Sequence, residues 1–356
     1  MDPLGQGVSK LGDKAVFIAK TLPGESGVAE VTRQTKGVQF GRVQELTGPA
    51  SNRVEPACVH FNRCPGCHYL HTDYESELVY KQQTLLRYLA RFPAVEAHLR
   101  VYPAMSRLSY RNRIQLHYRY HYLGLIDGVS DQVVEIPHCK ILHPSLTEAF
   151  QQLYSDKSWA ETHKGRGHCE LYLCNDEVRE SWNQPYAEGG FTQVNQAMNQ
   201  LLRTVVAECV EAGAGQVETL LDLFAGDGNL SAEIPVKKTQ VDCVASSKHA
   251  EAGASRFVAL DLFQDDALNT FRSQCPEKKF DVLLVDPPRK GFPVLDDWVK
   301  AYKPGQLVYV SCNAATMARD LESLSGRFTV EKVALIDLFP GTYHFETLVS
   351  LRFKNK

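Results

Sequence analysis

The sequence predicts an α/β fold in its carboxy-terminal half, preceded by a small β-barrel and by a segment that a ligand organises. Three observations predict this: short strands divided by glycine and proline near the amino terminus, closely spaced cysteines, and apolar strands that alternate with looser segments after residue 191. The chain has 356 residues, enough for two or three domains of about 150 residues. We place the domains at residues 1–50, 51–188 and 189–356.

Composition alone gives little support to a nucleic-acid partner. Hydrophobic residues make up 44% and charged residues 23%, which is ordinary for a globular protein, and the formal net charge is −3. The first residues lack an apolar leader, and no stretch reaches the roughly 18 apolar residues of a membrane span. We therefore expect a cytoplasmic protein without a membrane partner, whose ten cysteines are reduced and serve as core residues, ligands or nucleophiles.

The first 48 residues read as short strands. Val16–Ile18, Val28–Val31 and Gly41–Val43 are strand-like, and Pro23-Gly24 and Gly37 divide them. Strands of this length with such punctuation favour a small closed barrel.

A helix is expected over Tyr74–Leu89, and residues 81–121, which overlap it, depart from the overall composition. They carry eight basic residues and one acid, a net charge of +7 that leaves −10 for the rest of the chain. Basic groups neutralise phosphates and aromatic rings stack on unpaired bases, so this is a candidate RNA surface, although a solvated charged face fits the same pattern. The basic residues are Lys81, Arg87, Arg91, Arg100, Arg107, Arg111, Arg113 and Arg119, and the interleaved rings are Tyr88, Phe92, Tyr102, Tyr110, Tyr118 and Tyr120.

Three cysteines lie close together before this segment. Cys58, Cys64 and Cys67 form a C-x5-C-x2-C pattern. Iron–sulfur clusters usually take four thiolates, and Cys139 is the best candidate for the fourth. Zinc held by three cysteines and one histidine is the alternative, and free thiols in a loop are another. The neighbouring histidines are His60, His68, His71 and His138.

The carboxy-terminal half alternates between helical and strand patterns. Apolar residues recur at helical spacing from Val194 to Cys209. Four apolar runs read as strands of a sheet, and sites in such sheets lie at the carboxyl ends of the strands. These runs are Leu220–Phe224, Val282–Val285, Leu307–Val310 and Leu348–Leu351.

Two of these strands run into loops suited to a ligand. Phe224, Gly226 and Asn229 belong to a glycine loop that we expect to lead into a helix, and its glycines let the backbone approach a ligand closely. A tight turn is the simpler reading. Asp286 precedes two prolines at a strand end, where a substrate would sit, or where it would cap a helix beginning at Pro287.

The third strand ends at Cys312 and the fourth begins near Glu346. A thiol at a strand end, beside a helix amino terminus, can act as a nucleophile, and a nearby carboxylate can act as a base. An ordinary buried cysteine and a surface glutamate are the alternatives.

Together these motifs resemble the RNA uracil-C5 methyltransferases over nearly the whole chain. The family's order is kept from the opening Asp2-Pro-Leu-Gly-Gln-Gly7, through the cysteine pattern and Phe191-Thr-Gln193-Val-Asn195, to Ser311-Cys312-Asn313 and His344-Phe-Glu346-Thr347. The resemblance implies a TRAM barrel similar to OB folds, a central iron–sulfur and RNA-binding domain, and a Rossmann-like methyltransferase domain. It is greatest to the iron–sulfur, TRAM-containing members that act on 23S ribosomal RNA.

The resemblance also implies the cofactors and the site residues. S-adenosyl-L-methionine would be the methyl donor, held by Gln193, Phe224, Gly226, Asn229, Asp261 and Asp286. The cluster would be [4Fe-4S] on Cys58, Cys64, Cys67 and Cys139. Cys312 would attack a flipped or unpaired uridine, Glu346 would be the base and Asp286 would position the uracil. We expect a monomer.

Some residues depart from the family's pattern. Ala245 stands where an acid usually accepts the ribose hydroxyls of the cofactor, so we expect weaker binding of the cofactor unless Asp242 or Asp261 compensates. Pro65 and Ala314 replace a usual glycine and a usual proline. Three alternatives stay open: an enzyme acting on transfer RNA, a non-catalytic RNA-binding protein with a degenerate cofactor site, and an iron–sulfur electron-transfer protein.

Overall fold

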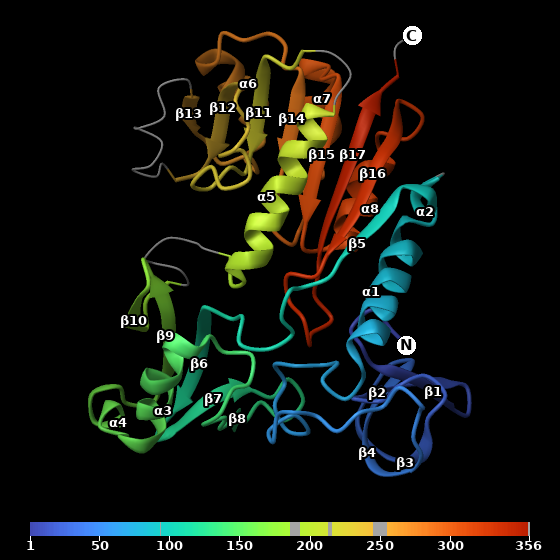
Figure 1. The fold of residues 1–356 in the computed structure, drawn as a ribbon, viewed down its shortest axis with the longest axis vertical. Coiled ribbons are helices and arrows are strands. Elements are labelled where there is room, and N and C mark those ends of the chain that lie inside the picture. The colour runs from blue at the N-terminus through green and yellow to red at the C-terminus, as the bar shows by residue number, and fades with distance from the viewer. Residues whose placement is uncertain (93, 186–192, 213–215, 245–254, 355–356) are drawn as a thin grey trace. The chain divides into compact units, whose positions relative to one another are not determined.

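The computed structural model describes residues 1–92, 94–185, 193–212, 216–244 and 255–354. Two compact units share the chain, and each is discontinuous in sequence (Figure 1). The amino-terminal unit comprises Met1–Thr84, Ala104–Gln196 and Phe339–His344, and the carboxy-terminal unit comprises Leu85–Pro103, Ala197–Leu338 and Phe345–Lys356.

The carboxy-terminal unit is built on an eight-stranded sheet in the order β13-β12-β11-β14-β15-β17-β16-β5. The first five strands are parallel, β17 is antiparallel to both its neighbours, and β5 is parallel to β16. The chain runs from β11 to β12 and β13 on one side and then crosses to β14 on the other side of β11, which places a topological switch point between β11 and β14. The strands are β5 (Leu99–Tyr102), β11 (Thr219–Leu223), β12 (Lys237–Asp242), β13 (Ser255–Ala259), β14 (Val282–Val285), β15 (Gln306–Ser311), β16 (Phe328–Ile336) and β17 (Glu346–Phe353).

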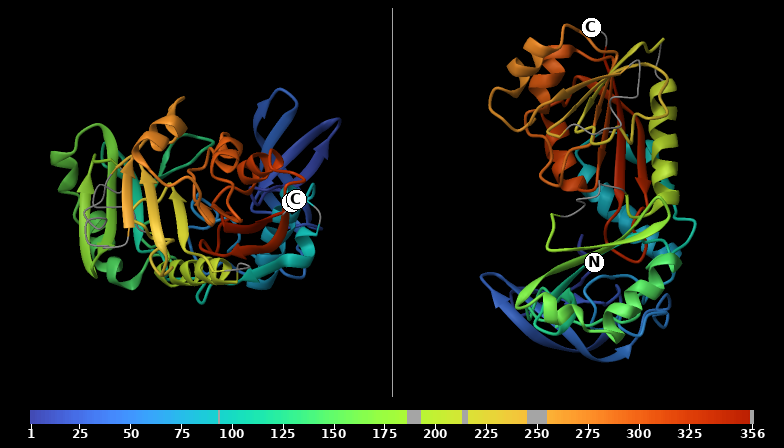
Figure 2. Two further views of the ribbon diagram at one scale, coloured as in Figure 1. Left: turned by 90° about the horizontal axis from the view of Figure 1, so that it is seen from above. Right: turned by 90° about the vertical axis from the view of Figure 1, so that its left-hand side faces the viewer.

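Helices cover both faces of this sheet, with α5 on one face and α6, α7 and α8 on the other (Figure 2). Phe271, Trp298 and Met317, one from each of the latter helices, belong to the same buried core as Leu223 and Tyr309 of the sheet. Burial on both faces explains why the central strands read as continuous apolar runs. The helices are α1 (Tyr74–Leu89), α2 (Val95–His98), α5 (Gln196–Glu211), α6 (Ala267–Gln274), α7 (Leu295–Tyr302) and α8 (Ala314–Glu322), and α1 is divided between the two units.

The amino-terminal unit contains two smaller sheets, in the orders β1-β2-β4-β3 and β10-β9-β6-β7-β8. Between them, residues 49–73 form neither helix nor strand, and this stretch holds three of the cysteines. The strands are β1 (Gly7–Leu11), β2 (Lys14–Ala19), β3 (Ser26–Thr35), β4 (Val38–Gly48), β6 (Arg113–Arg119), β7 (Tyr122–Ile126), β8 (Val133–Val134), β9 (Arg166–Cys174) and β10 (Glu177–Trp182). The remaining helices are η1 (Pro144–Leu146), α3 (Thr147–Ser155) and α4 (Trp159–Thr162).

The loop that leads into β17 is held by a buried carboxylate. Oε1 of Glu77 accepts hydrogen bonds from Lys81 Nζ and from the backbone N–H of Gly341, both at 2.7 Å. Oε2 of Glu77 pairs with the guanidinium of Arg107 at 2.7 Å. Because a buried carboxylate with several partners is rigidly fixed, Gly341 has a defined place within the amino-terminal unit.

Most of the predicted elements are confirmed. The helix has the expected bounds, Tyr74–Leu89, and the predicted strands of the carboxy-terminal half correspond to β11, β14, β15 and β17. The helix expected after Asn229 is wrong, because residues 226–233 form turns. The chain enters β12 at Lys237, which leaves few residues for a helix after Asn229. Pro235 also lacks the backbone N–H that a helix needs.

Part of the basic segment is not available to a polyanion. Lys81 and Arg113 are each only 1% exposed, and they pair with Glu77 and Glu170 inside the amino-terminal unit. These two side chains therefore cannot contact RNA phosphates. Tyr120, by contrast, is 74% exposed.

None of the helices in the described ranges is long and apolar enough to cross a lipid bilayer.

Candidate active site

Three side chains meet where neighbouring strands of the large sheet end. Asp286 follows β14, Cys312 follows β15, and Glu346 is the first residue of β17. Ser311 pairs with Thr347 in the antiparallel register, so Cys312 lies opposite Glu346 across the β15–β17 pair. The register of the sheet thus brings together a thiol and two carboxyl groups from distant parts of the sequence.

The thiol of Cys312 is half-buried and next to a helix amino terminus. Asn313 caps α8, because its side chain accepts a hydrogen bond from the N–H of Ala315. Burial and the negative charge of Glu346 raise the pKa of Cys312 to about 11. The positive charge of Arg289 opposes this shift. The resting thiol is therefore protonated, and Arg289 is the group that favours its ionisation.

Arg289 was not among the predicted site residues. Its carbonyl oxygen accepts hydrogen bonds from Asn313 Nδ2 at 2.9 Å and from Thr316 Oγ1 at 3.2 Å, which fix the loop after β14 against the start of α8. The positive charge of Arg289 also opposes the rise in the pKa of Glu346 that burial causes. The only signal in the sequence was its place directly after Asp286-Pro287-Pro288.

Glu346 is a buried carboxyl group with an unused oxygen. It is 5% exposed, and its Oε2 has no hydrogen-bond partner among the residues that the structure describes. Burial, together with the negative charge of Asp286, raises the pKa of Glu346 well above its ordinary value. A buried acceptor without a partner costs free energy, and such groups are found where a substrate supplies the missing partner.

Asp286 shares this electrostatic environment. Burial and repulsion from Asp222 raise the pKa of Asp286 to about 7. Asp222 is itself fully buried and accepts a hydrogen bond of 2.6 Å from Ser231 Oγ. No helix begins at Pro287, so the reading of Asp286 as a helix cap is wrong, and its carboxyl group remains available to a ligand.

The glycine loop after β11 turns tightly. Phe224, Gly226 and Gly228 all have positive φ angles, of 63°, 52° and 76°. The N–H of Gly226 donates to Asp242 Oδ2 at 2.9 Å, which joins the loop to the carboxyl end of β12. A turn with three left-handed residues exposes backbone to a ligand in a way that larger side chains would prevent.

The other residues expected around the cofactor lie in different places. Asn229 exchanges two hydrogen bonds with Asn199 of α5, at 3.0 and 2.8 Å. Asp261 follows β13 and accepts a 2.9 Å hydrogen bond from the N–H of Phe263 with Oδ1. Gln193 belongs to the amino-terminal unit, where its carbonyl accepts from Asn112 Nδ2. Phe224 packs against Phe263, with ring centroids 5.4 Å apart.

Ala245 stands where related enzymes carry an acid for the cofactor ribose, and it lies outside the described residues. The two acids considered as substitutes, Asp242 and Asp261, are both described. Asp242 already accepts from two backbone N–H groups, those of Gly226 and Cys243. Asp261 uses only Oδ1 in the described hydrogen bonds. Of the two acids considered as substitutes, Asp261 therefore has the more available oxygen.

Gly228 offers a test of the loop. A Cβ at this position would lie 2.3 Å from Nε2 of Gln240, whose side chain bonds to Ser231 and so to Asp222. We expect Gly228→Ala to lower the free energy of unfolding by about 1–3 kcal/mol in urea denaturation. Gly326→Ala is the control, since its φ is +82° but no atom lies within 4 Å of the added Cβ. Equal losses in both variants would contradict a role for the clash.

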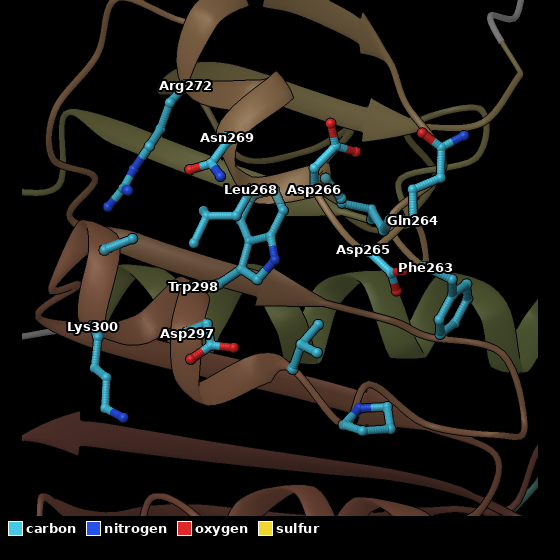
Figure 3. A pocket seen from close by; sticks show the side chains of 15 residues that line it. Phe263, Gln264, Asp265, Asp266, Leu268, Asn269, Arg272, Asp297, Trp298 and Lys300 are labelled. Atoms are coloured by element: carbon cyan, nitrogen blue, oxygen red, sulfur yellow. The ribbon is translucent and has the colours of Figure 1, made fainter.

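A cavity of about 600 Å³ opens between α6 and α7 (Figure 3). Its lining includes Phe263, Asp265, Arg272 and Lys300. Phe263 is the residue that connects this cavity to Phe224 and the glycine loop. Because Cys312 and Glu346 do not line it, the cavity is separate from the three-strand site.

The four cysteines of the predicted metal site gather in the amino-terminal unit. Cys139 packs against two buried clusters, one of which contains Cys64 and the other Cys67, with Cys58 beside it. The four are free thiols. Burial, followed by the charges of the other three, raises the pKa of Cys67 beyond the ordinary range of a thiol. The thiols are thus close enough to affect one another's ionisation.

Within the described part of the chain, no group of three or more His, Cys, Asp or Glu side chains is arranged to hold one metal ion. The zinc alternative, which needs four ligands around one ion, therefore has no support from the geometry.

Comparison with known proteins gives a consistent result. Residues 267–354 match the model of the tRNA (uracil-5-)-methyltransferase family. The chain is 28% identical over 411 aligned residues to a 23S rRNA (uracil(1939)-C(5))-methyltransferase of Vibrio vulnificus, covering 98% of this chain and 93% of that protein. It is 29% identical to an uncharacterized RNA methyltransferase of Bdellovibrio bacteriovorus, with 98% and 92% covered.

A solved structure shares the fold. The tRNA (uracil-54, C5)-methyltransferase of Pyrococcus abyssi, solved in complex with S-adenosyl-L-homocysteine, superposes with a TM-score of 0.72 and 21% identity, covering 97% of this chain and 100% of that one. The α/β fold predicted from the strand pattern is therefore confirmed.

Proposed function

We propose that this chain, which belongs to the RNA uracil-C5 methyltransferase family, transfers a methyl group from S-adenosyl-L-methionine to carbon 5 of a uridine in 23S ribosomal RNA. The observation that carries the proposal is the meeting of Cys312, Glu346 and Asp286 at the ends of adjacent strands, with Arg289 acting on the first two. Carbon 5 of uracil is a poor nucleophile, and a thiol beside a carboxyl group is the pair needed to activate it and then to restore the ring.

The residues divide the reaction into three steps. The Cys312 thiolate adds to carbon 6 of the uracil, which pushes electrons onto the O4 side of the ring as an enolate. Carbon 5, made nucleophilic by this addition, would accept the methyl group that S-adenosyl-L-methionine supplies when bound, with S-adenosylhomocysteine as the other product. Glu346 removes the proton from carbon 5, and the electron pair of that C–H bond expels the thiolate of Cys312, which yields 5-methyluridine.

Arg289 and Asp286 support these steps. Arg289 favours the thiolate and counters the developing negative charge of the enolate. Asp286 is held near Glu346 and would position the uracil by hydrogen bonding to its ring. The base has to leave a duplex, or be unpaired already, to reach strand ends inside a folded protein.

We propose that S-adenosylmethionine binds to residues of the glycine loop and of the neighbouring strand ends. Phe224 and Gly226 lie on the loop, Asn229 follows it, and Asp261 follows β13 with one carboxylate oxygen available to the ribose. Gln193, the remaining residue of the predicted set, belongs to the amino-terminal unit. When bound, the cofactor supplies an electrophilic methyl group.

Mapping of modified nucleotides tests the substrate. We expect a strain that lacks this chain to lose one 5-methyluridine from 23S ribosomal RNA, and the purified protein to restore it in vitro. Loss of a 5-methyluridine from transfer RNA instead would establish the second candidate, which the family model and the shared fold of the Pyrococcus abyssi enzyme favour. An unchanged pattern in both RNAs, together with failure to bind S-adenosylmethionine, would leave only a non-catalytic RNA-binding role.

The rate of methylation should depend steeply on pH. Because the pKa of Cys312 is raised to about 11, the reactive thiolate fraction grows about tenfold per pH unit below that value. We therefore expect kcat/KM for RNA to rise between pH 6 and 9, measured by single-turnover transfer of labelled methyl groups. A rate that stays constant over this interval would contradict nucleophilic attack by a thiol of raised pKa.

We further propose a [4Fe-4S] cluster on Cys58, Cys64, Cys67 and Cys139. The proposal is supported by the donor set, since four free thiols of the amino-terminal unit affect one another's ionisation and such clusters usually take four thiolates. Within this proposal, residues 1–50 form a TRAM barrel, and the part of residues 51–188 that belongs to the amino-terminal unit forms a central domain around the cluster. Iron and sulfide analysis of anaerobically purified protein tests it, and zinc without sulfide would favour the alternative.

A further inference from the structure

Lys20 links the first sheet of the amino-terminal unit to the cysteine segment. It follows β2, and its Nζ donates hydrogen bonds to the carbonyl oxygens of Phe61 and Cys64, the second at 2.8 Å. The ammonium also lies 4.4 Å from the centroid of the Phe61 ring. One side chain from the sheet thus holds both the backbone and a ring of the loop between Cys58 and Cys67.

The backbone of Lys20 is fixed in an unusual conformation. Its φ is +61°, a left-handed value that a residue with a side chain rarely adopts. Arg53 Nη2 donates to the carbonyl of Lys20 at 3.0 Å, and the same guanidinium pairs with Glu25. Glu25 in turn accepts from the N–H of Leu22 at 2.8 Å. A glycine would meet the backbone requirement with less strain, so the presence of lysine points to a use for its side chain.

The ammonium of Lys20 lies beside the cysteine loop, because its Nζ is 2.8 Å from the carbonyl oxygen of Cys64. Iron–sulfur clusters on four thiolates are net negative, and nearby charges and hydrogen bonds set their reduction potential.

We propose that Lys20 is a positioning residue for the cysteine-bound cluster, holding the Cys58–Cys67 loop against the first sheet and placing a fixed positive charge beside the cluster. This inference rests on the proposed cluster. It has two separable consequences: the hydrogen bonds slow the loss of the cluster, and the charge raises its reduction potential.

The test compares Lys20→Met, which keeps the length but removes the charge, with Lys20→Arg, which keeps the charge. In anaerobically purified protein, we expect Lys20→Met to lose iron and sulfide in air about tenfold faster than the wild type. A potentiometric titration followed by visible absorption should show its midpoint shifted to a more negative potential. Lys20→Arg should retain most of the wild-type potential.

Two further variants separate charge from anchoring. Arg53→Met loosens the backbone of Lys20 but leaves its ammonium, so it should lose the cluster faster at an unchanged potential. Lys10→Met removes an exposed charge from β1 and should change neither quantity.

The outcomes are distinguishable. A wild-type potential and wild-type retention in Lys20→Met would overturn the inference while leaving the cluster in place. Absence of iron and sulfide from the wild-type protein would overturn the cluster itself and, with it, the role of Lys20. If Lys20→Met holds no cluster at all, retention and potential in Lys20→Arg decide: their recovery supports the inference, and a failure of both contradicts it.

Discussion

Replacement of Cys312 by alanine is expected to lower the rate of RNA methylation by at least about 10⁴-fold, the scale seen when an enzyme loses its nucleophile. The variant keeps Glu346, Asp286 and Arg289, but none of these can form the covalent bond to carbon 6 that activates carbon 5. Single-turnover transfer of a labelled methyl group to RNA measures the loss. The binding of S-adenosylhomocysteine, followed by calorimetry, should remain close to that of the wild type.

Cys174→Ala is the matched control, because Cys174 is a half-buried free thiol, like Cys312, but lies on β9 in the other unit. It should methylate RNA at the wild-type rate. RNA with fluorine at carbon 5 of the target gives a second readout, since that carbon then carries no proton to remove. The wild type should form a protein–RNA adduct that survives denaturing electrophoresis, and Cys312→Ala should form none. Methylation by Cys312→Ala at the wild-type rate would rule out the covalent mechanism.

The sequence allowed the large sheet to be predicted better than its site. Apolar runs such as Val282–Val285 and Leu307–Val310 identify central strands because both of their faces are buried. The order of the strands and the register that sets Cys312 opposite Glu346 are long-range properties, so only the resemblance to a family linked these two residues. The contribution of Arg289 depends on how Asn313 and Thr316 hold its loop, which no local pattern reveals.

The two misjudged features have physical causes as well. Leu230, Ala232 and Glu233 favour a helix, but Gly226, Gly228, the short return to β12 and Pro235 outweigh their propensity. The basic segment looked uniformly exposed because charge patterns carry no information on distant partners. Arg113 is neutralised by Glu170 on the neighbouring strand β9, more than 50 positions away in the sequence, and so is buried.

Replacement of Glu346 by glutamine is expected to slow turnover by about 10²–10⁴-fold, the usual contribution of a general base. The addition of Cys312 and the methyl transfer do not need this carboxylate, whereas removal of the carbon 5 proton does. The methylated covalent adduct should therefore accumulate in Glu346→Gln and appear as a slow band in denaturing electrophoresis of ordinary RNA with S-adenosylmethionine. Glu322→Gln, on an exposed ion pair with Arg91, is the control and should show no such band.

The stability of Glu346→Gln distinguishes a functional carboxyl group from a structural one. The pKa of Glu346 is raised in the folded protein, so ionisation of this carboxyl group favours the unfolded state. The free energy of unfolding therefore falls as the pH rises above the pKa that Glu346 has in the unfolded chain. At pH 8 the neutral glutamine avoids this cost, so thermal unfolding should occur at the wild-type temperature or above it. A variant that is inactive, forms the adduct and is no less stable would identify Glu346 as the base. An inactive variant that unfolds at a lower temperature and forms no adduct would show instead that Glu346 supports the fold.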